Sequence, residues 1–287
     1  MELTSPTAIK DLLYKHEAKA SKGLGQNFLI DQHILDKIIE AADIKPDDVV
    51  LEVGPGLGTL TQRLAQKAKQ VVAVEKDETM IKILEETLKD YNNVEVLRGD
   101  ILEQDFKLPK NYKVVANIPY YITAPLIRAL LENENQPSEI VLMLQKEVAQ
   151  RICSKPPSMS LLAVSVQFYA EPKIVSYVSK NCFWPAPKID SAIIKIVPFG
   201  AGQGRAKISA NEFFKVVKAG FIQPRKQLVN NLTTLKFVDG VKLDNLIVRQ
   251  QISSWLLKNS IKPNQRAETL SVSDWINLTK SLENFNA

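Results

Sequence analysis

Three glycines spaced two residues apart, Gly54, Gly56 and Gly58, follow an apolar run and lead into a helical pattern. Glycine is needed where the backbone turns with a positive φ angle or approaches a ligand without a Cβ atom in the way. A second apolar run ends in an acidic residue, Glu75, which comes 17 residues after Gly58. A carboxylate at about this spacing binds the ribose in nucleoside-binding α/β folds. Together these features predict a site for a cofactor that contains adenosine.

The type of cofactor depends on the glycine spacing and on Glu52. A dinucleotide fingerprint has the pattern Gly-x-Gly-x-x-Gly, whereas the third glycine here comes one residue early. The Glu52 carboxylate, two residues before Gly54, would repel a pyrophosphate but suit the cationic amino-acid end of S-adenosylmethionine. We therefore expect S-adenosylmethionine and disfavour a nicotinamide oxidoreductase. A purely structural glycine turn is the remaining alternative.

A second pattern with chemical potential is Asn117-Ile118-Pro119-Tyr120, which follows a predicted strand. The exocyclic amine of adenine is a poor nucleophile, because its lone pair is delocalised into the ring. The Asn117 side-chain oxygen and a nearby backbone carbonyl could accept both of its N–H groups and so favour a pyramidal nitrogen. Pro119 shapes the turn and has no N–H, while Tyr120 offers a face on which a flipped base can stack. The pattern favours methyl transfer to a base amine; a strand-ending turn with a packed tyrosine is the alternative.

An open parallel sheet would position these residues. Apolar strand patterns alternate with helical ones, which indicates a largely parallel sheet with helices on both faces. Ligands bind at the carboxyl edge of such sheets, and Glu75, Asp100 and Asn117 all come at predicted strand ends. We expect strands at residues 49–53, 71–75, 94–97, 112–116, 139–144, 173–178 and 191–197, and helices near 5–20, 34–39, 60–65, 77–89, 124–131, 145–153 and 159–169.

Composition excludes several classes of protein. The 287 residues are 45% hydrophobic and 24% charged, as in ordinary globular proteins. No apolar run reaches the roughly 18 residues of a membrane span, and the N-terminus lacks the pattern of a signal peptide, so we expect a cytoplasmic protein. Cys153 and Cys182 form no CxxC motif, and His16 and His33 form no cluster with ligand spacing. These features argue against a disulfide framework and against a metal site.

Positive charge is concentrated in the last part of the chain. Residues 201–287 hold 13 Lys and Arg but 6 Asp and Glu, a net charge of +7, whereas the whole chain has a net charge of +5. Residues 200–204 read as a linker, and beyond them only helical patterns occur, at 211–221, 225–234, 242–257 and 272–284. We expect a catalytic domain at 1–200 and a helical domain at 201–287 that binds a polyanion. A solvated basic surface is the alternative.

Over nearly its whole length the chain resembles the KsgA/RsmA ribosomal RNA adenine dimethyltransferases, which share a superfamily with the Erm methyltransferases and mitochondrial transcription factor B. Besides the glycines, Glu75 and residues 117–120, the resemblance rests on residues 25–29, 99–100, 183–191, 224–232 and 266–270. One departure is Pro224-Arg225-Lys226, where the family often has two adjacent arginines. The resemblance implies an α/β, Rossmann-like class I S-adenosylmethionine methyltransferase domain with a mostly parallel seven-stranded sheet, and a small all-α C-terminal domain.

The resemblance also implies a set of cofactor-binding residues. Asn27 and Leu29 would contact the methionine end of S-adenosylmethionine, Glu75 would accept hydrogen bonds from the ribose, and Asp100 would accept from the adenine amine. The complete expected set is Gln26, Asn27, Leu29, Gly54, Gly56, Glu75, Lys76, Asp100, Ile101 and Asn117.

For the target base, the resemblance implies that Asn117 lies between the cofactor and the base, on the turn that it forms with Ile118 and Pro119. Tyr120 and Phe183 would hold the base between them. An aromatic residue beside a proline is often an ordinary core residue, and this alternative stays open for Phe183.

The resulting hypothesis is an enzyme that transfers methyl groups from S-adenosylmethionine to N6 of two adjacent adenosines near the 3′ end of small-subunit (16S) ribosomal RNA. We expect it to act as a monomer on a pre-30S particle during ribosome biogenesis, without membrane attachment. The alternatives are an Erm-type enzyme that methylates 23S ribosomal RNA, and a non-catalytic ribosome-assembly or transcription factor of the same fold.

Overall fold

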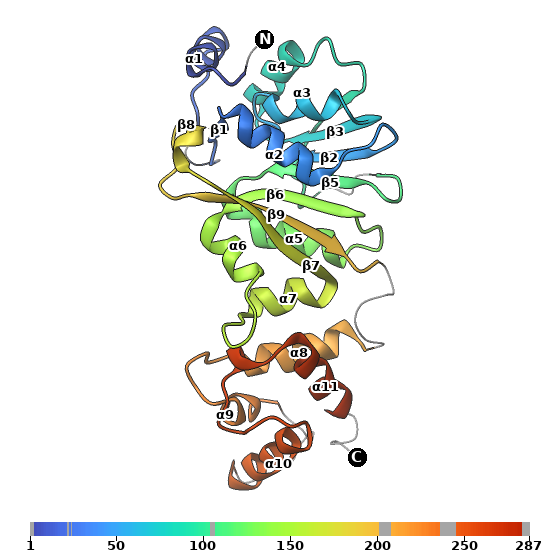
Figure 1. Cartoon of the computed structure of the whole chain (residues 1–287), viewed down its shortest axis with the longest axis vertical. Coiled ribbons are helices and arrows are strands. Elements are labelled where there is room, and N and C mark those ends of the chain that lie inside the picture. Colours follow the sequence, from blue (N-terminus) through green and yellow to red (C-terminus); the bar gives the residue numbers. More distant parts are fainter. Residues whose placement is uncertain are drawn as a thin grey trace. The chain divides into compact units, whose positions relative to one another are not determined.

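The computed structural model in Figure 1 describes residues 3–21, 23, 25–103, 107–200, 208–235 and 245–282. The chain forms two compact units, which are residues 1–150 with 170–201, and residues 151–169 with 202–287. The sequence predicted a single boundary at residue 200, and most of the predicted linker at 200–204 lies outside the described residues. The structure differs because the helix α7 (Leu161–Tyr169) buries Ala163, Val164 and Phe168 in the core of the C-terminal unit.

A seven-stranded sheet forms the centre of the first unit, with the order β4-β3-β2-β5-β6-β9-β7. The first five strands in this order are parallel, and β9 pairs antiparallel with both of its neighbours, β6 and β7. This confirms the expected mostly parallel seven-stranded sheet. Its strands are β2 (Val49–Val53), β3 (Gln70–Glu75), β4 (Val94–Arg98), β5 (Lys113–Asn117), β6 (Glu139–Gln145), β7 (Ala170–Val178) and β9 (Ser191–Pro198).

Helices cover the sheet. The helices α2 (Gln32–Ala42) and α3 (Thr59–Ala65) pack on one face through an apolar cluster that includes Ile38, Leu64 and Val115. The helix α5 (Thr123–Glu132) lies behind the sheet in Figure 1. The remaining elements are α1 (Pro6–Lys15), α4 (Glu78–Thr87), the 3-10 turns at Tyr120–Ile122 and Lys180–Cys182, and α6 (Lys146–Ile152).

A two-stranded sheet that the sequence did not predict joins distant parts of the chain. Its strands are β1 (Phe28–Leu29) and β8 (Phe183–Trp184), which pair antiparallel. The β1 segment leads directly to Asp31, whose carboxylate accepts the Ile34 N–H at 3.1 Å and so caps α2. The start of α2 is thereby fixed close to residues 26–29 of the predicted cofactor site.

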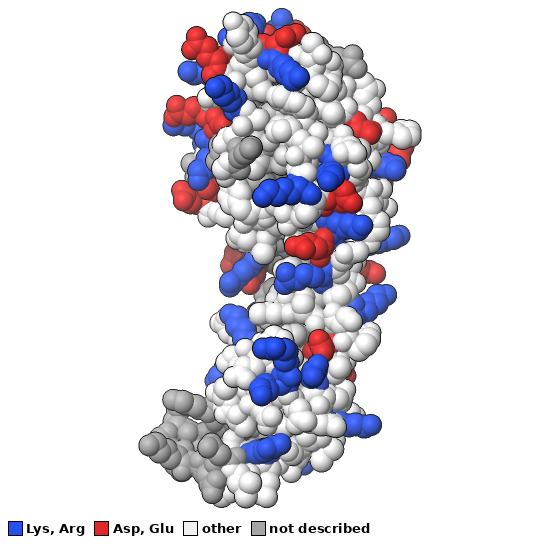
Figure 2. Space-filling view, turned by 90° about the vertical axis from the view of Figure 1, so that its left-hand side faces the viewer, with Lys and Arg blue, Asp and Glu red and all other residues white. Residues whose placement is uncertain are grey.

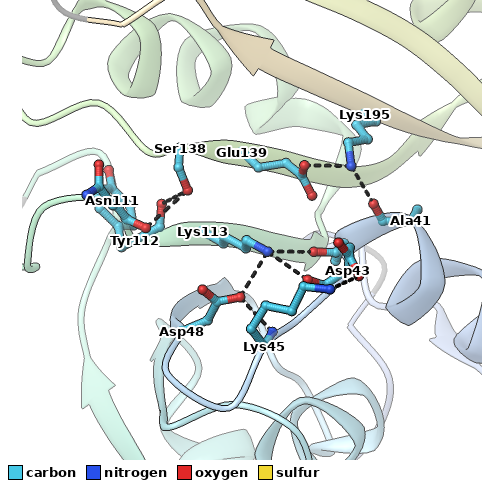
Figure 3. Close-up of polar contacts among 11 residues, drawn as sticks. Ala41, Asp43, Lys45, Asp48, Asn111, Tyr112, Lys113, Ser138, Glu139 and Lys195 are labelled. Carbon is cyan, nitrogen blue, oxygen red and sulfur yellow. Dashed lines mark hydrogen bonds and ion pairs between the residues drawn. The ribbon is translucent and has the colours of Figure 1, made fainter.

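The far end of α2 is held by two lysines of the sheet (Figure 3). Lys113 Nζ donates to the backbone oxygens of Ala42 at 3.1 Å and Asp43 at 2.9 Å, and pairs with Asp48 at 2.9 Å. Lys195 Nζ donates to the Ala41 oxygen at 2.9 Å and pairs with Glu139. Positive charge at a helix C-terminus satisfies its last carbonyl groups and interacts favourably with the helix dipole. Both ends of α2 are therefore fixed relative to the sheet.

The described part of the C-terminal unit is helical, as expected. Its core contains Trp255, Trp275 and Phe213, and Phe168 stacks on Phe213 with ring centroids 4.0 Å apart. The helices after α7 are α8 (Ala210–Gly220), α9 (Leu228–Leu232), α10 (Asn245–Lys258) and α11 (Val272–Leu282), with a 3-10 turn at Ala267–Thr269.

One helix boundary in this unit was predicted wrongly. The sequence placed a helix start at residue 225, but α9 begins at Leu228, and Arg225 and Lys226 lie in the preceding turn. The turn is closed by the Lys226 N–H, which donates to the Gln223 oxygen at 2.9 Å. Residues 242–244 and 283–284 of two other predicted helices lie outside the described residues.

None of the helices in the described ranges is both long and apolar enough to cross a membrane. Within the same ranges, no group of three or more His, Cys, Asp or Glu side chains is arranged to bind a metal ion.

Candidate cofactor and base site

One pocket at the carboxyl edge of β2, β3, β4 and β5 brings together all of the predicted site residues except Phe183. The residues of the prediction that line it are Gln26, Asn27, Leu29, Gly54, Gly56, Glu75, Lys76, Asp100, Ile101, Asn117, Ile118, Pro119 and Tyr120. They come from five separate segments of the chain. Each segment except residues 26–29 directly follows a parallel strand, as expected for a ligand site in an open α/β sheet.

The glycine turn between β2 and α3 allows several elements to approach one another closely. Gly54 has a φ angle of +68°, and a Cβ atom there would lie 3.4 Å from Pro119 Cδ. Gly58 has a φ angle of +88°, and a Cβ atom there would lie 3.1 Å from both Leu84 Cδ2 and Thr87 Oγ1. A side chain at either position would strain the backbone, and at Gly58 it would also press against α4. Glycine therefore determines the shape of the pocket at this loop.

The Glu75 carboxylate holds the glycine loop against the end of β3. Its Oε2 atom accepts the Gly56 N–H at 3.2 Å, and Oε1 accepts the N–H groups of Lys76 at 2.8 Å and Asp77 at 2.9 Å. Burial raises the pKa of Glu75, and these three donors oppose that shift. Because each carboxylate oxygen has two lone pairs, the Oε2 atom can still accept from a bound hydroxyl group.

The Gln26 side chain is bonded to other protein groups at both of its polar atoms. Its Nε2 donates to Asp77 Oδ2 at 2.8 Å, and its Oε1 accepts the Ser21 N–H at 2.8 Å. Asp77 Oδ1 in turn accepts the Thr79 N–H at 2.9 Å and caps α4. Gln26 therefore ties the loop before β1 to the start of α4 and closes one side of the pocket.

Asp100 and Lys76 form an ion pair within the pocket lining. Lys76 Nζ lies 2.8 Å from Asp100 Oδ2, and the Leu102 N–H donates to Asp100 Oδ1 at 3.0 Å. Together the Lys76 ammonium and the Leu102 N–H lower the pKa of Asp100. The carboxylate therefore stays ionised and retains lone pairs for an amine donor.

The orientation of the Asn117 amide is set by its neighbour in the pocket. Asn117 Nδ2 donates to the backbone oxygen of Asn27 at 3.3 Å, and Asn27 Nδ2 donates to the Gly25 oxygen at 3.0 Å. Because the amide NH2 group of Asn117 is engaged in this way, its oxygen is the atom that remains to accept an N–H group. This is the polarity that an adenine amine would require.

Tyr120 is fixed by a residue to which the sequence gave no role. The Tyr120 hydroxyl and Ser191 Oγ form a hydrogen bond of 2.8 Å, and Ser191 is fully buried at the start of β9. Burial raises the pKa of Tyr120, and the bond to Ser191 opposes that shift. Ser191 lies in the family-like segment 183–191, so that segment was the available signal. A second missed residue, Tyr121, also lines the pocket and has 59% of its surface exposed.

Phe183 is not brought to the pocket. It is only 3% exposed, pairs with Leu29 across the small sheet, and packs in a cluster with Val178 and Ile193. In this structure it is a core residue, which is the alternative that the sequence left open. A base-stacking role for Phe183 stays a prediction.

Glu52 is a buried acid that lines the pocket without a partner for one oxygen. It is 1% exposed, and its Oε2 atom has no hydrogen-bond partner among the described residues. Burial raises the pKa of Glu52 from its ordinary 4.5 to about 8, and the charge of Glu75 adds to the shift. A positive charge beside this carboxyl group would favour its ionised form and oppose the effect of burial. Together with the glycine loop and the acceptors Glu75 and Asp100, Glu52 fits S-adenosylmethionine, which carries an ammonium, a sulfonium, ribose hydroxyls and an amine.

Comparisons with known proteins give a consistent result. Residues 17–284 match the family model described as ribosomal RNA adenine dimethylase. A ribosomal RNA small subunit methyltransferase A from Dehalococcoides mccartyi strain CBDB1 is 44% identical over 270 residues, which are 93% of this chain and 89% of the relative. The protein of that name from Alkaliphilus metalliredigens is 39% identical over 291 residues, covering 98% of each chain.

Two solved structures resemble the fold over most of its length. A dimethyladenosine transferase from Plasmodium falciparum has a TM-score of 0.76 and 29% identity, covering 90% of this chain and 98% of that one. The 23S rRNA methyltransferase ErmE has a TM-score of 0.71 and 27% identity, covering 90% of this chain and 100% of that one.

The buried state of Glu52 predicts a specific pH dependence of stability. The pKa of Glu52 in the folded protein, about 8, lies above the ordinary value of 4.5. The stability that the protonated Glu52 provides is therefore complete below pH 4.5 and is lost as the pH rises through 8. We expect Glu52→Gln to lose less stability than the wild type between pH 5 and pH 8, as measured by urea denaturation. Glu40→Gln, a change at an exposed acid of α2, is the control. Identical pH profiles for Glu52→Gln and the wild type would show that Glu52 ionises normally.

Proposed function

Because the chain belongs to the ribosomal RNA adenine dimethylase family, we propose that its substrate is small-subunit ribosomal RNA within a pre-30S particle. The family activity is S-adenosylmethionine-dependent dimethylation of adenine in ribosomal RNA. The proposed targets are two adjacent adenosines near the 3′ end of the RNA, and the proposed working form is a cytoplasmic monomer. The names of the relatives from Dehalococcoides and Alkaliphilus support the small subunit as the substrate.

The observation that carries the proposal is the orientation of Asn117 beside the glycine loop. The Asn27 oxygen holds the amide NH2 group at 3.3 Å, so the amide oxygen can accept an N–H of the target amine. Pro119 has no backbone N–H that would compete with the amine for this oxygen. S-adenosylmethionine supplies a methyl group already activated by a positive sulfur, so positioning and electrostatics are the main tasks of the protein. Tyr120, held by Ser191, would present a fixed ring for the base to stack on.

The proposed cofactor contacts follow from the groups that line the pocket. Glu52 and the segment 27–29 would face the methionine end of S-adenosylmethionine. Gly54 and Gly56 would approach the backbone of the cofactor, and Glu75 would bind its ribose. Asp100 would accept from the adenine amine, with Lys76 and Ile101 beside it. Asp100 already pairs with Lys76 at 2.8 Å, so the proposed contact uses a lone pair that this ion pair leaves available.

An Erm-type activity on large-subunit RNA is the second candidate, and the structural similarity to ErmE over 90% of the chain favours keeping it. The sequence relatives favour the small subunit, because their names state that substrate and they match nearly the whole chain. A non-catalytic factor is disfavoured by the complete set of acceptors around the pocket.

For the C-terminal unit we propose RNA and ribosome binding. Its sequence, residues 151–169 and 202–287, contains 15 Lys and Arg but 6 Asp and Glu. In Figure 2 basic side chains outnumber acidic ones on the face of this unit that is in view. Phosphate neutralisation by Lys and Arg supplies most of the affinity in non-specific RNA binding, so this excess of charge suits a structured RNA partner. The same proposal includes the segment 19–22, which carries Lys19 and Lys22 in the sequence, although Lys22 lies outside the described residues.

Transfer of labelled methyl groups from S-adenosylmethionine to small-subunit particles that lack the modification tests the proposed function. We expect label in N6,N6-dimethyladenosine at two adjacent positions near the 3′ end of the RNA. Label in large-subunit RNA only would establish the Erm-type alternative, and no transfer to either subunit would overturn the catalytic proposal.

Replacing Asn117 by Ala tests the proposed mechanism. We expect the single-turnover rate to fall about 100-fold or more, the scale of removing one preorganised polar group that acts on the transition state. RNA binding should change little, because phosphate contacts supply most of it, and calorimetry should still detect cofactor binding. Asn92→Ala, at an exposed position, is the matched control. A near-normal rate in Asn117→Ala would reduce Asn117 to a structural residue.

Replacing Arg225 and Lys226 together by Ala tests the role of the C-terminal unit. Both side chains are exposed in the turn before α9. We expect weaker binding to small-subunit particles and a slope of log affinity against log salt that is smaller by about 2, with unchanged cofactor affinity. The control removes the same charge at Lys67 and Lys69, which are exposed before β3 at the amino edge of the sheet. Filter-binding curves that superimpose on this control would assign Arg225 and Lys226 to a solvated surface.

A further inference from the structure

A basic hollow lies beside the candidate site in the first unit. It is formed by the start of α6 and the segment 180–190, has a volume of about 390 Å³, and is lined by Lys146, Lys180 and Lys188 together with Glu147 and Asp190. No known or proposed function described above uses these lysines.

The positive charges of this hollow are not neutralised by ion pairs. None of the three lysines forms a salt bridge with any side chain in the described ranges. Lys146 Nζ lies 5.1 Å from the centre of the Tyr177 ring, a contact that orients the ammonium without cancelling its charge. Asp190 Oδ1 accepts the backbone N–H of Lys180 at 3.1 Å, so this acid closes the 180–190 segment. The hollow therefore has lysine side chains available to a ligand anion.

The hollow is adjacent to the tyrosine proposed to stack on the target base. In the β6–β9 ladder Gln145 pairs with Ser191, and Ser191 Oγ is hydrogen-bonded to the Tyr120 hydroxyl at 2.8 Å. Lys146 and Asp190 are the next residues beyond that pair, and the Lys146 N–H donates to the Asp190 oxygen at 3.1 Å. One residue of an extended strand covers about 3.3 Å. The hollow thus begins about one residue beyond the wall of the base site.

We propose that Lys146, Lys180 and Lys188 hold a phosphodiester of the ribosomal RNA strand next to the target adenosine. The inference rests on the proposed function, because it takes Tyr120 as the contact of the target base. An enzyme that acts on a base extruded from its stack must compensate for the lost stacking and pairing. Lysine ammonium groups beside the base site provide this compensation by binding the phosphates of the backbone that carries the extruded nucleotide. The hollow would therefore position the strand as well as add affinity.

The test compares the full-length wild type with Lys180→Ala/Lys188→Ala in single-turnover methyl transfer to small-subunit particles that lack the modification. Both lysines are exposed, so the fold does not depend on their side chains. We expect the half-saturating particle concentration to rise about tenfold and the salt slope to fall by about 2 for two lost phosphate contacts. Cofactor affinity measured by calorimetry should stay unchanged, because neither lysine lines the cofactor pocket.

Two further variants make the result specific. Lys180→Arg/Lys188→Arg keeps both charges and should behave nearly as the wild type, whereas Lys67→Ala/Lys69→Ala removes the same charge at the opposite edge of the sheet and should have little effect. If the Ala variant at 180 and 188 matches the Lys67 and Lys69 control, the inference is wrong. A wild type that fails to methylate the particles would instead overturn the proposed function, so the two failures are distinguishable.

Discussion

The Glu75 carboxylate is the interaction on which the pocket depends. Its oxygens accept the backbone N–H groups of Gly56, Lys76 and Asp77, so one buried side chain joins the glycine loop to the end of β3. Asp77 extends the junction by capping α4 and by accepting the side chain of Gln26. A site built in this way is preorganised, because the elements that would contact a cofactor are already bonded to one another. The acid proposed to bind the ribose also maintains the loop that would face the rest of the cofactor.

The antiparallel end of the sheet supports the side of the pocket where the target base would bind, as Glu75 supports the cofactor side. A purely parallel sheet would end at β6, but β9 runs back beside it and brings Ser191 to the hydroxyl of Tyr120. Asn117 is held from the other direction by the backbone of Asn27, which precedes β1. The two residues proposed to act on the base, at the end of β5 and in the turn after it, are thus oriented by segments outside the parallel strands. Such support gives catalytic groups the precision that loops alone lack.

Local patterns in the sequence predicted the parallel sheet, the glycine loop and the strand-end residues Glu75, Asp100 and Asn117, because each strand end and glycine turn is encoded within a few adjacent residues. Residues 26–29 were expected only from the family resemblance, because no local pattern places that segment beside the strand ends. The small β1–β8 sheet was missed, since its strands are two residues long and pair Leu29 with Phe183 across the fold. That pairing is also why Phe183 lies in the core. The start of α9 was predicted wrongly because the apolar spacing of Leu228, Val229 and Leu232 does not reveal the turn that includes Arg225. The pairing of Tyr120 with Ser191 depends on strand register, which a single sequence does not show.

Because residues 151–169 belong to the C-terminal unit, their core is completed late during synthesis of the chain. The helix α7 packs with α8 and α11 in one core, but α11 (Val272–Leu282) follows it by about 100 residues. At a synthesis rate of about 5–20 residues per second, α7 leaves the ribosome roughly 5–20 s before that part of its core exists. During this interval the apolar side chains of Ala163, Val164 and Phe168 are not yet fully buried. The nascent chain therefore presents a defined hydrophobic segment to chaperones while the strands on either side of it are free to begin folding.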